Sequence, residues 1–108
     1  MGVEGHQYDR KLSMGQFAVY ILRCVDGTYY VGSTSDVADR VATHNEGRGP
    51  RFTNCRLPTT LVYTEPFGTM AQARSREIQI KKWSRAKKEA LIEGAMDRLH
   101  RLSRRRTQ

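Results

Sequence analysis

The 108-residue sequence has few of the features that mark secreted, zinc-binding or membrane proteins. Its two cysteines, Cys24 and Cys55, stand without a CxxC pair or a nearby histidine pattern, so neither a disulfide framework nor a zinc site is indicated. No segment approaches the ~20 consecutive apolar residues of a membrane-spanning helix, and residues 1–13 lack the apolar core of a signal peptide. These absences predict a soluble, cytoplasmic protein whose length suits a single domain.

The positive charge lies in one part of the chain. The net charge is +8, but residues 1–65 hold seven basic and seven acidic side chains, whereas residues 66–108 hold twelve basic and four acidic ones. Clustered cations bind phosphates by releasing condensed counterions, so this asymmetry indicates a surface that faces a polyanion. A solvent-exposed basic helix followed by an irregular C-terminal tail accounts for the composition equally well.

The pattern of apolar residues, caps and turn residues predicts an α/β (α+β) fold. The predicted elements are strands at about 16–24 and 28–33, a helix from Ser35 or Asp36 to about Asn45, a strand at 59–65, and helices from Thr69 to Lys82 and from Ser84 to Gly94. The order β-β-α-β-α-α predicts a three-stranded, mostly antiparallel sheet flanked by helices. Residues 46–58, crowded with Gly, Pro and Asn, predict an irregular loop. We divide the chain into a flexible N-terminal extension (1–15), one domain (16–94) and a basic C-terminal tail (95–108).

The turn between the first two strands decides which side chains meet. If the loop is the three residues 25–27 with Gly27 in the left-handed region, Tyr20 and Tyr30 lie on one face of the sheet. A two-residue turn places them on opposite faces, because one step of register flips a strand. We predict the three-residue form, which brings the two tyrosines together.

Glu77 interrupts an apolar stripe of the predicted helix 69–82. The other members of the stripe are Met70, Ala73 and Ile80. Burying an unpaired carboxylate costs several kcal/mol, so Glu77 needs a cation, a hydrogen-bonding network or a metal ion. The alternative is a glutamate at the stripe's edge that pairs with Arg74 or Lys81 and reaches water.

Arg40 and His44 stand four residues apart on the first predicted helix and therefore on the same side of it. They lie beside the apolar face formed by Val37 and Val41, at the rim of the core. An arginine there suits bidentate binding of a phosphate, and a histidine one turn later suits proton transfer. The alternative is a solvent-facing pair with His44 favoured by the helix dipole.

Together these residues resemble the GIY-YIG nuclease family, in particular its small stand-alone bacterial members. The residues that carry the resemblance are Ala18-Val19-Tyr20, Tyr30-Val31-Gly32, Arg40, His44 and Glu77. The resemblance covers roughly residues 16–93. It implies a nucleic-acid substrate, DNA rather than RNA, and one divalent metal ion, Mg²⁺ or Mn²⁺.

The resemblance also implies a role for each residue. Tyr20 matches the tyrosine that lies beside the attacked phosphate and is a candidate general base. Tyr30 matches the tyrosine that orients the nucleophile or the phosphate. Arg40 matches the arginine that contacts the scissile phosphate, and Glu77 matches the single carboxylate that binds the metal. His44 stands where some family nucleases have a histidine, which makes it a further catalytic candidate.

Two positions depart from the family pattern. Ala18 replaces the glycine of the first motif, and Ser33 stands where several family nucleases have lysine, so a positive group near the phosphate is missing. Further basic residues of the loop and the helical half are candidates for binding nucleic acid. These are Arg48, Arg51, Arg56, Lys81, Lys82 and Arg85.

We therefore predict a metal-dependent endonuclease of low sequence specificity, because no base-reading helix is evident. The alternative is a binding module with the same fold that cuts slowly or not at all. The set Tyr20, Tyr30, Arg40 and Glu77 favours the enzyme, whereas Ser33 and the lack of a separate recognition domain favour the module.

Overall fold

Three antiparallel strands form the centre of the fold in a computed structural model that describes residues 17–107, and their side chains as far as residue 103. The elements are β1 (Phe17–Arg23), β2 (Tyr29–Thr34), α2 (Val37–Thr43), η1 (His44–Arg48), α3 (Arg51–Asn54), β3 (Thr60–Phe67), α4 (Met70–Lys81), α5 (Arg85–Glu93) and α6 (Met96–Thr107). The α+β class and the three-stranded sheet confirm the prediction. The N-terminal extension at 1–15 lies outside the described residues.

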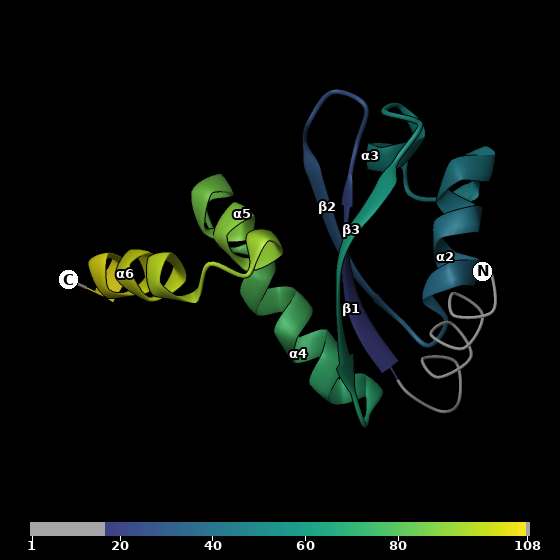
Figure 1. The fold of residues 1–108 in the computed structure, drawn as a ribbon. Helices are drawn as coiled ribbons and strands as arrows, with labels where there is room; N and C mark the ends of the chain where they lie inside the picture. Colours follow the sequence, from purple (N-terminus) through teal and green to yellow (C-terminus); the bar gives the residue numbers. More distant parts are fainter. Residues whose placement is uncertain (1–16, 108) are drawn as a thin grey trace, which may run out of the picture.

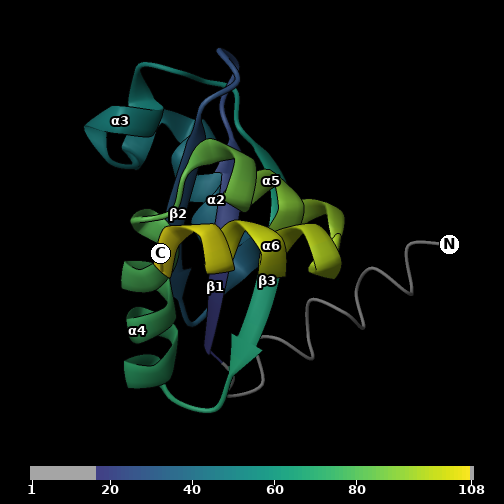
Figure 2. The ribbon, with the colours of Figure 1, turned by 90° about the vertical axis from the view of Figure 1, so that its left-hand side faces the viewer.

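The sheet has β1 in its middle, in the order β2-β1-β3, with both neighbours antiparallel to it. Helices α4, α5 and α6 lie on one side of the sheet and α2 and α3 on the other (Figure 1). In the turned view, α4, α5 and α6 stand in front of the strands (Figure 2). Both faces of β1 are thereby covered, which suits the mostly apolar side chains of Phe17–Leu22.

The β1–β2 hairpin has the predicted three-residue loop. The Cys24 amide donates to the Thr28 carbonyl at 2.8 Å, and Gly27 has a φ of +88°. Tyr30 lies opposite Leu22 in this register. The register places Tyr20 and Tyr30 on the same face, with ring centroids 6.2 Å apart, and this confirms the prediction.

The helices pack on the sheet through two apolar clusters. The larger cluster lies on the α4 side and contains Val19, Ile21, Val31, Ala73, Ile80, Ala90, Leu91 and Leu99. A smaller one joins Ala18 to Val37 beneath α2. Helices α4 and α5 begin at the predicted caps Thr69 and Ser84, and α5 ends at Gly94 with a φ of +73°. No helix among residues 17–107 is long and apolar enough to cross a membrane.

The predicted irregular loop at 46–58 contains a short helix, α3, and the prediction was wrong for these residues. Pro50 lies directly before α3, and its carbonyl accepts from the Asn54 amide at 2.9 Å and from the Thr53 hydroxyl at 3.1 Å. A proline at a helix start sacrifices no hydrogen bond, because the first amides of a helix lack partners anyway. In the sequence, a proline next to glycine is equally typical of a loop.

The segment after Gly94 forms helix α6, where the sequence had predicted a basic tail and no helix. Leu99 is buried, and the partly buried Leu102 packs against the same core cluster. Their spacing of three residues places them on one side of the helix. Because arginines surround this short apolar pattern, the sequence alone does not predict the helix.

Candidate active site

Three of the predicted catalytic residues form one aromatic cluster between the sheet and α2. The Tyr20 hydroxyl, from β1, lies 3.0 Å from His44 Nε2. The His44 ring is 5.0 Å from that of Tyr30, on β2, and 5.9 Å from that of Tyr20. Tyr20 and His44 are fully buried and Tyr30 is half-buried. The cluster thus reaches the surface at Tyr30.

Two glycines make room for this cluster. Gly32 lies opposite Tyr20 in the sheet, and a Cβ atom on it would stand 2.5 Å from the Tyr20 hydroxyl oxygen. A Cβ atom on Gly49 would stand 2.7 Å from His44 Nδ1. Both values are far inside van der Waals contact, so the close fit of Tyr20 and His44 requires glycine at both positions.

Thr53 holds the far side of the His44 ring. Its hydroxyl oxygen is 2.8 Å from His44 Nδ1 and donates its single hydrogen to the Pro50 carbonyl. The oxygen therefore accepts from a protonated Nδ1, and this leaves the lone pair of Nε2 to accept from the Tyr20 hydroxyl. Sequence reasoning missed Thr53, because only the folding of α3 brings it to His44.

Burial keeps both members of the Tyr20–His44 bond uncharged. It raises the pKa of Tyr20, and the neighbouring Tyr30 phenol raises it further, while the charge of Arg40 acts in the opposite direction. Burial also lowers the pKa of His44, and Arg40 adds to that change. Near neutral pH the pair is a phenol and a neutral imidazole, so Tyr20 is not a phenolate base in this state.

The lowered pKa of His44 predicts an acid-sensitive fold. As the pH falls below about 6.5, the unfolded chain takes up a proton that folded His44 does not. The free energy of unfolding should therefore decrease through this range and level off once the pH lies below the folded pKa. Urea unfolding from about pH 7.5 to about pH 5.5 measures this slope.

The matched control for this prediction is His100, which lies exposed on α6. His44→Gln should flatten the slope, whereas His100→Gln should leave it unchanged. An equally steep slope in His44→Gln would show that other groups cause the acid sensitivity.

Arg40 lies at the open side of the cluster. It is exposed on α2, yet its charge is close enough to oppose the rise in the pKa of Tyr20 and to contribute to the lowered pKa of His44. Within the part of the chain whose side chains are described, Arg40 forms no ion pair. A guanidinium so placed suits an anion that approaches the tyrosines.

Glu77 reaches the edge strand β2 from α4. Its carboxylate accepts from the Ser33 hydroxyl and lies 2.7 Å from the Lys81 ammonium, with 14% of the side chain exposed. Burial raises its pKa, but the hydrogen bonds from Lys81 and Ser33 and the charges of Lys81 and Arg74 outweigh burial and lower it. Ser33, which departs from the family pattern, thus holds the candidate metal ligand in place.

The Glu77 carboxylate suits a hydrated divalent cation better than a metal enclosed by protein ligands. No group of three His, Cys, Asp or Glu side chains that could hold a metal ion occurs in the described residues. Mg²⁺ commonly binds through one or two carboxylates and keeps several waters, so a single glutamate fits this ion. The Lys81 ammonium neutralises this carboxylate, and half of the Lys81 side chain is exposed to solvent.

Most of the predicted nucleic-acid-binding cations have carboxylate partners within the chain. These pairs are Arg48–Glu46, Arg56–Asp26, Lys81–Glu77 and Arg85–Glu89. Arg51 and Lys82 are exposed. Surface ion pairs contribute only about 0–1 kcal/mol, so they leave these side chains able to bind phosphate.

Arg85 lies apart from the tyrosine cluster. Its guanidinium stacks 4.6 Å from the Tyr29 ring centroid and donates to the Gly27 carbonyl at 2.8 Å. These contacts hold α5 against the hairpin on the side of the sheet opposite α3 (Figure 1). The six cations therefore do not form one continuous surface.

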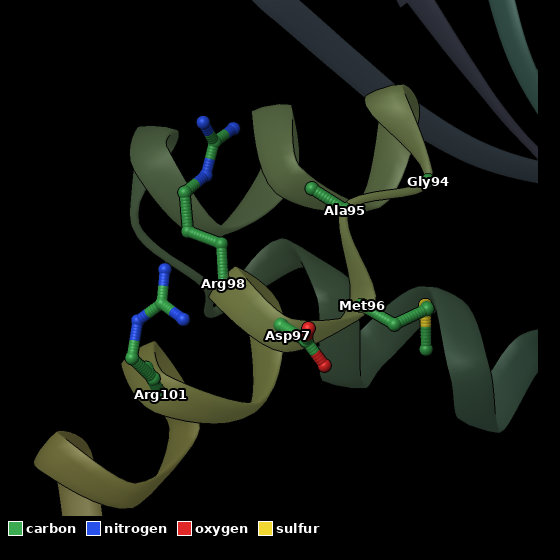
Figure 3. A pocket seen from close by; sticks show the side chains of 6 residues that line it. All are labelled: Gly94, Ala95, Met96, Asp97, Arg98 and Arg101. Atoms are coloured by element: carbon green, nitrogen blue, oxygen red, sulfur yellow. The ribbon is translucent and has the colours of Figure 1, made fainter.

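A cavity of about 500 Å³ lies at the junction of α5 and α6 and contains none of the predicted site residues. Its lining residues are Gly94, Ala95, Met96, Asp97, Arg98 and Arg101. Figure 3 shows the guanidinium groups of Arg98 and Arg101 directed to one side of the cavity and Met96 to the other. Arg98 pairs with Glu93 at 2.7 Å. Asp97 is the single carboxylate among these lining residues, so we do not consider this cavity as the candidate active site.

Known proteins are similar to this chain in sequence and in fold. A family model described as the GIY-YIG catalytic domain matches residues 16–90. The chain is 53% identical over 74 residues to a UPF0213 protein of Halobacterium salinarum. The aligned residues are 68% of this chain and 96% of that protein. It is 44% identical over 80 residues to a UPF0213 protein of Staphylococcus haemolyticus, with 74% and 98% covered. An NMR structure of the E. faecalis protein EF2693 is similar with a TM-score of 0.52 and 31% identity, covering 75% of this chain and 86% of that one. The names of these relatives state no activity or substrate.

Proposed function

Because the chain belongs to the GIY-YIG domain family, a family of nucleases, we propose that it is an endonuclease that hydrolyses phosphodiester bonds with one divalent metal ion. We further propose DNA rather than RNA as the substrate, cut with low sequence specificity. The observation that carries the proposal is the buried bond of 3.0 Å between the Tyr20 hydroxyl and His44 Nε2. It joins a phenol at the candidate site to a proton acceptor.

Because the raised pKa of Tyr20 disfavours a free phenolate, we propose that Tyr20 and His44 accept the proton together. As a water oxygen forms its bond to phosphorus, the water gives a proton to Tyr20 Oη while the phenolic proton of Tyr20 passes to His44 Nε2. Thr53 Oγ1, which accepts from Nδ1, holds the resulting imidazolium in place. The bond from phosphorus to the leaving oxygen then breaks, and that oxygen takes a proton from solvent.

Tyr30 and Arg40 place the reacting groups. Tyr20 is buried behind the half-buried Tyr30, so water approaches Tyr20 past the Tyr30 phenol, which orients it. Arg40 binds the phosphate oxygens and offsets the charge that develops on them in the transition state. Glu77 would hold the divalent metal ion through its carboxylate. When bound there, the metal supplies Lewis-acid polarisation of the phosphate and stabilises the leaving oxygen.

The binding module stays a second candidate function because a cation already neutralises Glu77. The ammonium of Lys81, 2.7 Å from the carboxylate, competes with a divalent ion for the same oxygens. If Lys81 keeps this place when nucleic acid binds, the protein grips its ligand through Arg and Lys side chains and cuts slowly or not at all.

Incubation of the full-length protein with single-stranded, duplex and branched DNA and with structured RNA tests the proposal. We expect cleavage of DNA that requires Mg²⁺ or Mn²⁺ and stops on addition of chelator. Binding to the same substrates without cleavage under any metal would support the binding module. Cleavage that continues in chelator would contradict the metal-dependent mechanism.

A further inference from the structure

A row of aromatic rings runs from the buried bond to the surface and ends at Phe52. The row passes from Tyr20 through His44 to Tyr30, whose ring centroid is 6.1 Å from that of Phe52. Phe52 lies on α3, and 39% of it is exposed. Among the described residues, it is the exposed aromatic side chain that touches the candidate catalytic cluster.

The position of Phe52 is fixed by its neighbours. Thr53, the next residue, is fully buried and hydrogen-bonded to the His44 ring, so it anchors α3 to the cluster. The Arg56 guanidinium lies 4.2 Å from the Phe52 ring centroid and donates to the Phe52 carbonyl at 2.9 Å. Asp26 holds that guanidinium from the hairpin at 3.0 Å. The ring and the guanidinium are therefore a preorganised pair.

The exposed apolar side chains elsewhere have a different setting. Val25, Leu61, Ile78 and Met96 are exposed to a similar or greater degree, but they are aliphatic and no ring contact joins them to the cluster. Isolated exposed apolar residues are common on protein surfaces and need no explanation. A rigid ring that touches a catalytic tyrosine and carries a stacked arginine is less common, and this pairing is suited to a flat ligand.

We propose that Phe52 and Arg56 form a stacking subsite for an unpaired nucleobase next to the phosphate that Arg40 binds. Bases stack readily on aromatic rings and on guanidinium planes. A base inside a duplex has both faces covered by its neighbours, so only an unpaired or flipped base reaches the ring. The exposed Arg51, one residue before Phe52, supplies a cation for the adjoining backbone phosphate. The subsite thus favours single-stranded or frayed substrates, and it deepens the proposed function on which it rests.

Binding of short oligonucleotides in chelator tests the subsite without cleavage. Phe52→Ala should weaken binding of a single strand by about fivefold or more, because one base–aromatic stack contributes about 1–3 kcal/mol. Binding of a blunt duplex of the same sequence should change by less than about twofold. Phe52→Leu, which keeps the apolar volume and removes the ring, should behave like Phe52→Ala. Leu61→Ala, on β3 and similarly exposed, is the matched control and should leave both affinities unchanged.

Fluorescence gives an independent readout of stacking. A single strand that carries 2-aminopurine should be quenched more strongly by Phe52→Trp than by the wild type, and this variant should keep single-strand affinity. Full affinity of Phe52→Leu, or equal losses for single strand and duplex in Phe52→Ala, would overturn the proposal. Unchanged single-strand affinity in Phe52→Ala would overturn it too, and would indicate that the exposed ring contacts a protein partner instead.

The failure of this subsite is distinguishable from failure of the nuclease proposal. If the wild type cuts DNA and Phe52→Ala binds normally, only the subsite is wrong. If the wild type never cuts but Phe52→Ala loses single-strand affinity, the subsite stands as part of a binding module.

Discussion

Glu77→Gln is expected to abolish metal-dependent cleavage, lowering the rate by about a thousandfold or more, while binding of nucleic acid changes by less than about twofold. A divalent ion such as Mg²⁺ prefers charged oxygen ligands, and the neutral amide oxygen of glutamine replaces one poorly. Arg and Lys side chains elsewhere bind the nucleic acid, so the substitution should leave the affinity nearly unchanged. Cleavage and filter binding on the same DNA separate the two effects.

The stability of Glu77→Gln gives a second test. The Ser33 hydroxyl still has an oxygen to donate to, and the Lys81 ammonium, half of whose side chain is exposed, regains water. The free energy of unfolding without metal should therefore change by no more than about 1 kcal/mol. A larger loss would mean that the Glu77–Lys81 pair has a structural role.

Glu89 offers a matched control for Glu77. It also pairs with a basic residue four positions away, Arg85, at 3.0 Å, but its hydrogen-bond partner on β2 is Tyr29 and not Ser33. Glu89→Gln should leave cleavage unchanged. Wild-type cleavage by Glu77→Gln would defeat the catalytic interpretation, as would trace cleavage that ignores both chelator and this substitution.

Local sequence signals were sufficient for the hairpin and for the helix boundaries near Glu77. The Asp26-Gly27 turn predicted the hairpin, and the expected shared face of Tyr20 and Tyr30 selected the three-residue loop that is observed, with Gly27 at positive φ. Thr69 and Ser84 cap the helices that follow them with their own side chains. Each of these features depends on residues within a few positions, so a single sequence contains them.

Features that depend on distant partners were not visible in the sequence. Thr53 belongs to a segment rich in Gly and Pro, and nothing near it indicates that its hydroxyl meets His44. Whether Lys81, Arg74 or a metal would compensate Glu77 was equally open, because the choice depends on how α4 meets β2. Leu99 becomes a core residue only because α6 folds back onto α5, which a run of arginines does not indicate.

Gly32→Ala is expected to displace Tyr20 and to lower cleavage by about a hundredfold or more, because a misplacement of about 1 Å is enough for a loss of this size. The added Cβ atom would stand 2.5 Å from the Tyr20 hydroxyl oxygen, 2.6 Å from Cζ and 2.9 Å from Cε1. The ring is only 2% exposed, and it has His44 and Tyr30 as neighbours. It therefore has no free space to enter without breaking its bond to His44.

The same overpacking should lower the free energy of unfolding by about 1–3 kcal/mol. Gly68→Ala is the matched control, since the nearest atom to its added Cβ is a Gln72 side-chain oxygen at 3.8 Å, and it should change neither property. Tyr20→Leu removes the atoms that the new methyl group meets, so the double variant Gly32→Ala/Tyr20→Leu should lose less stability than the sum of the two single losses. Strict additivity, with an unchanged His44 ring signal in NMR spectra of Gly32→Ala, would show that the glycine does not set the position of the tyrosine.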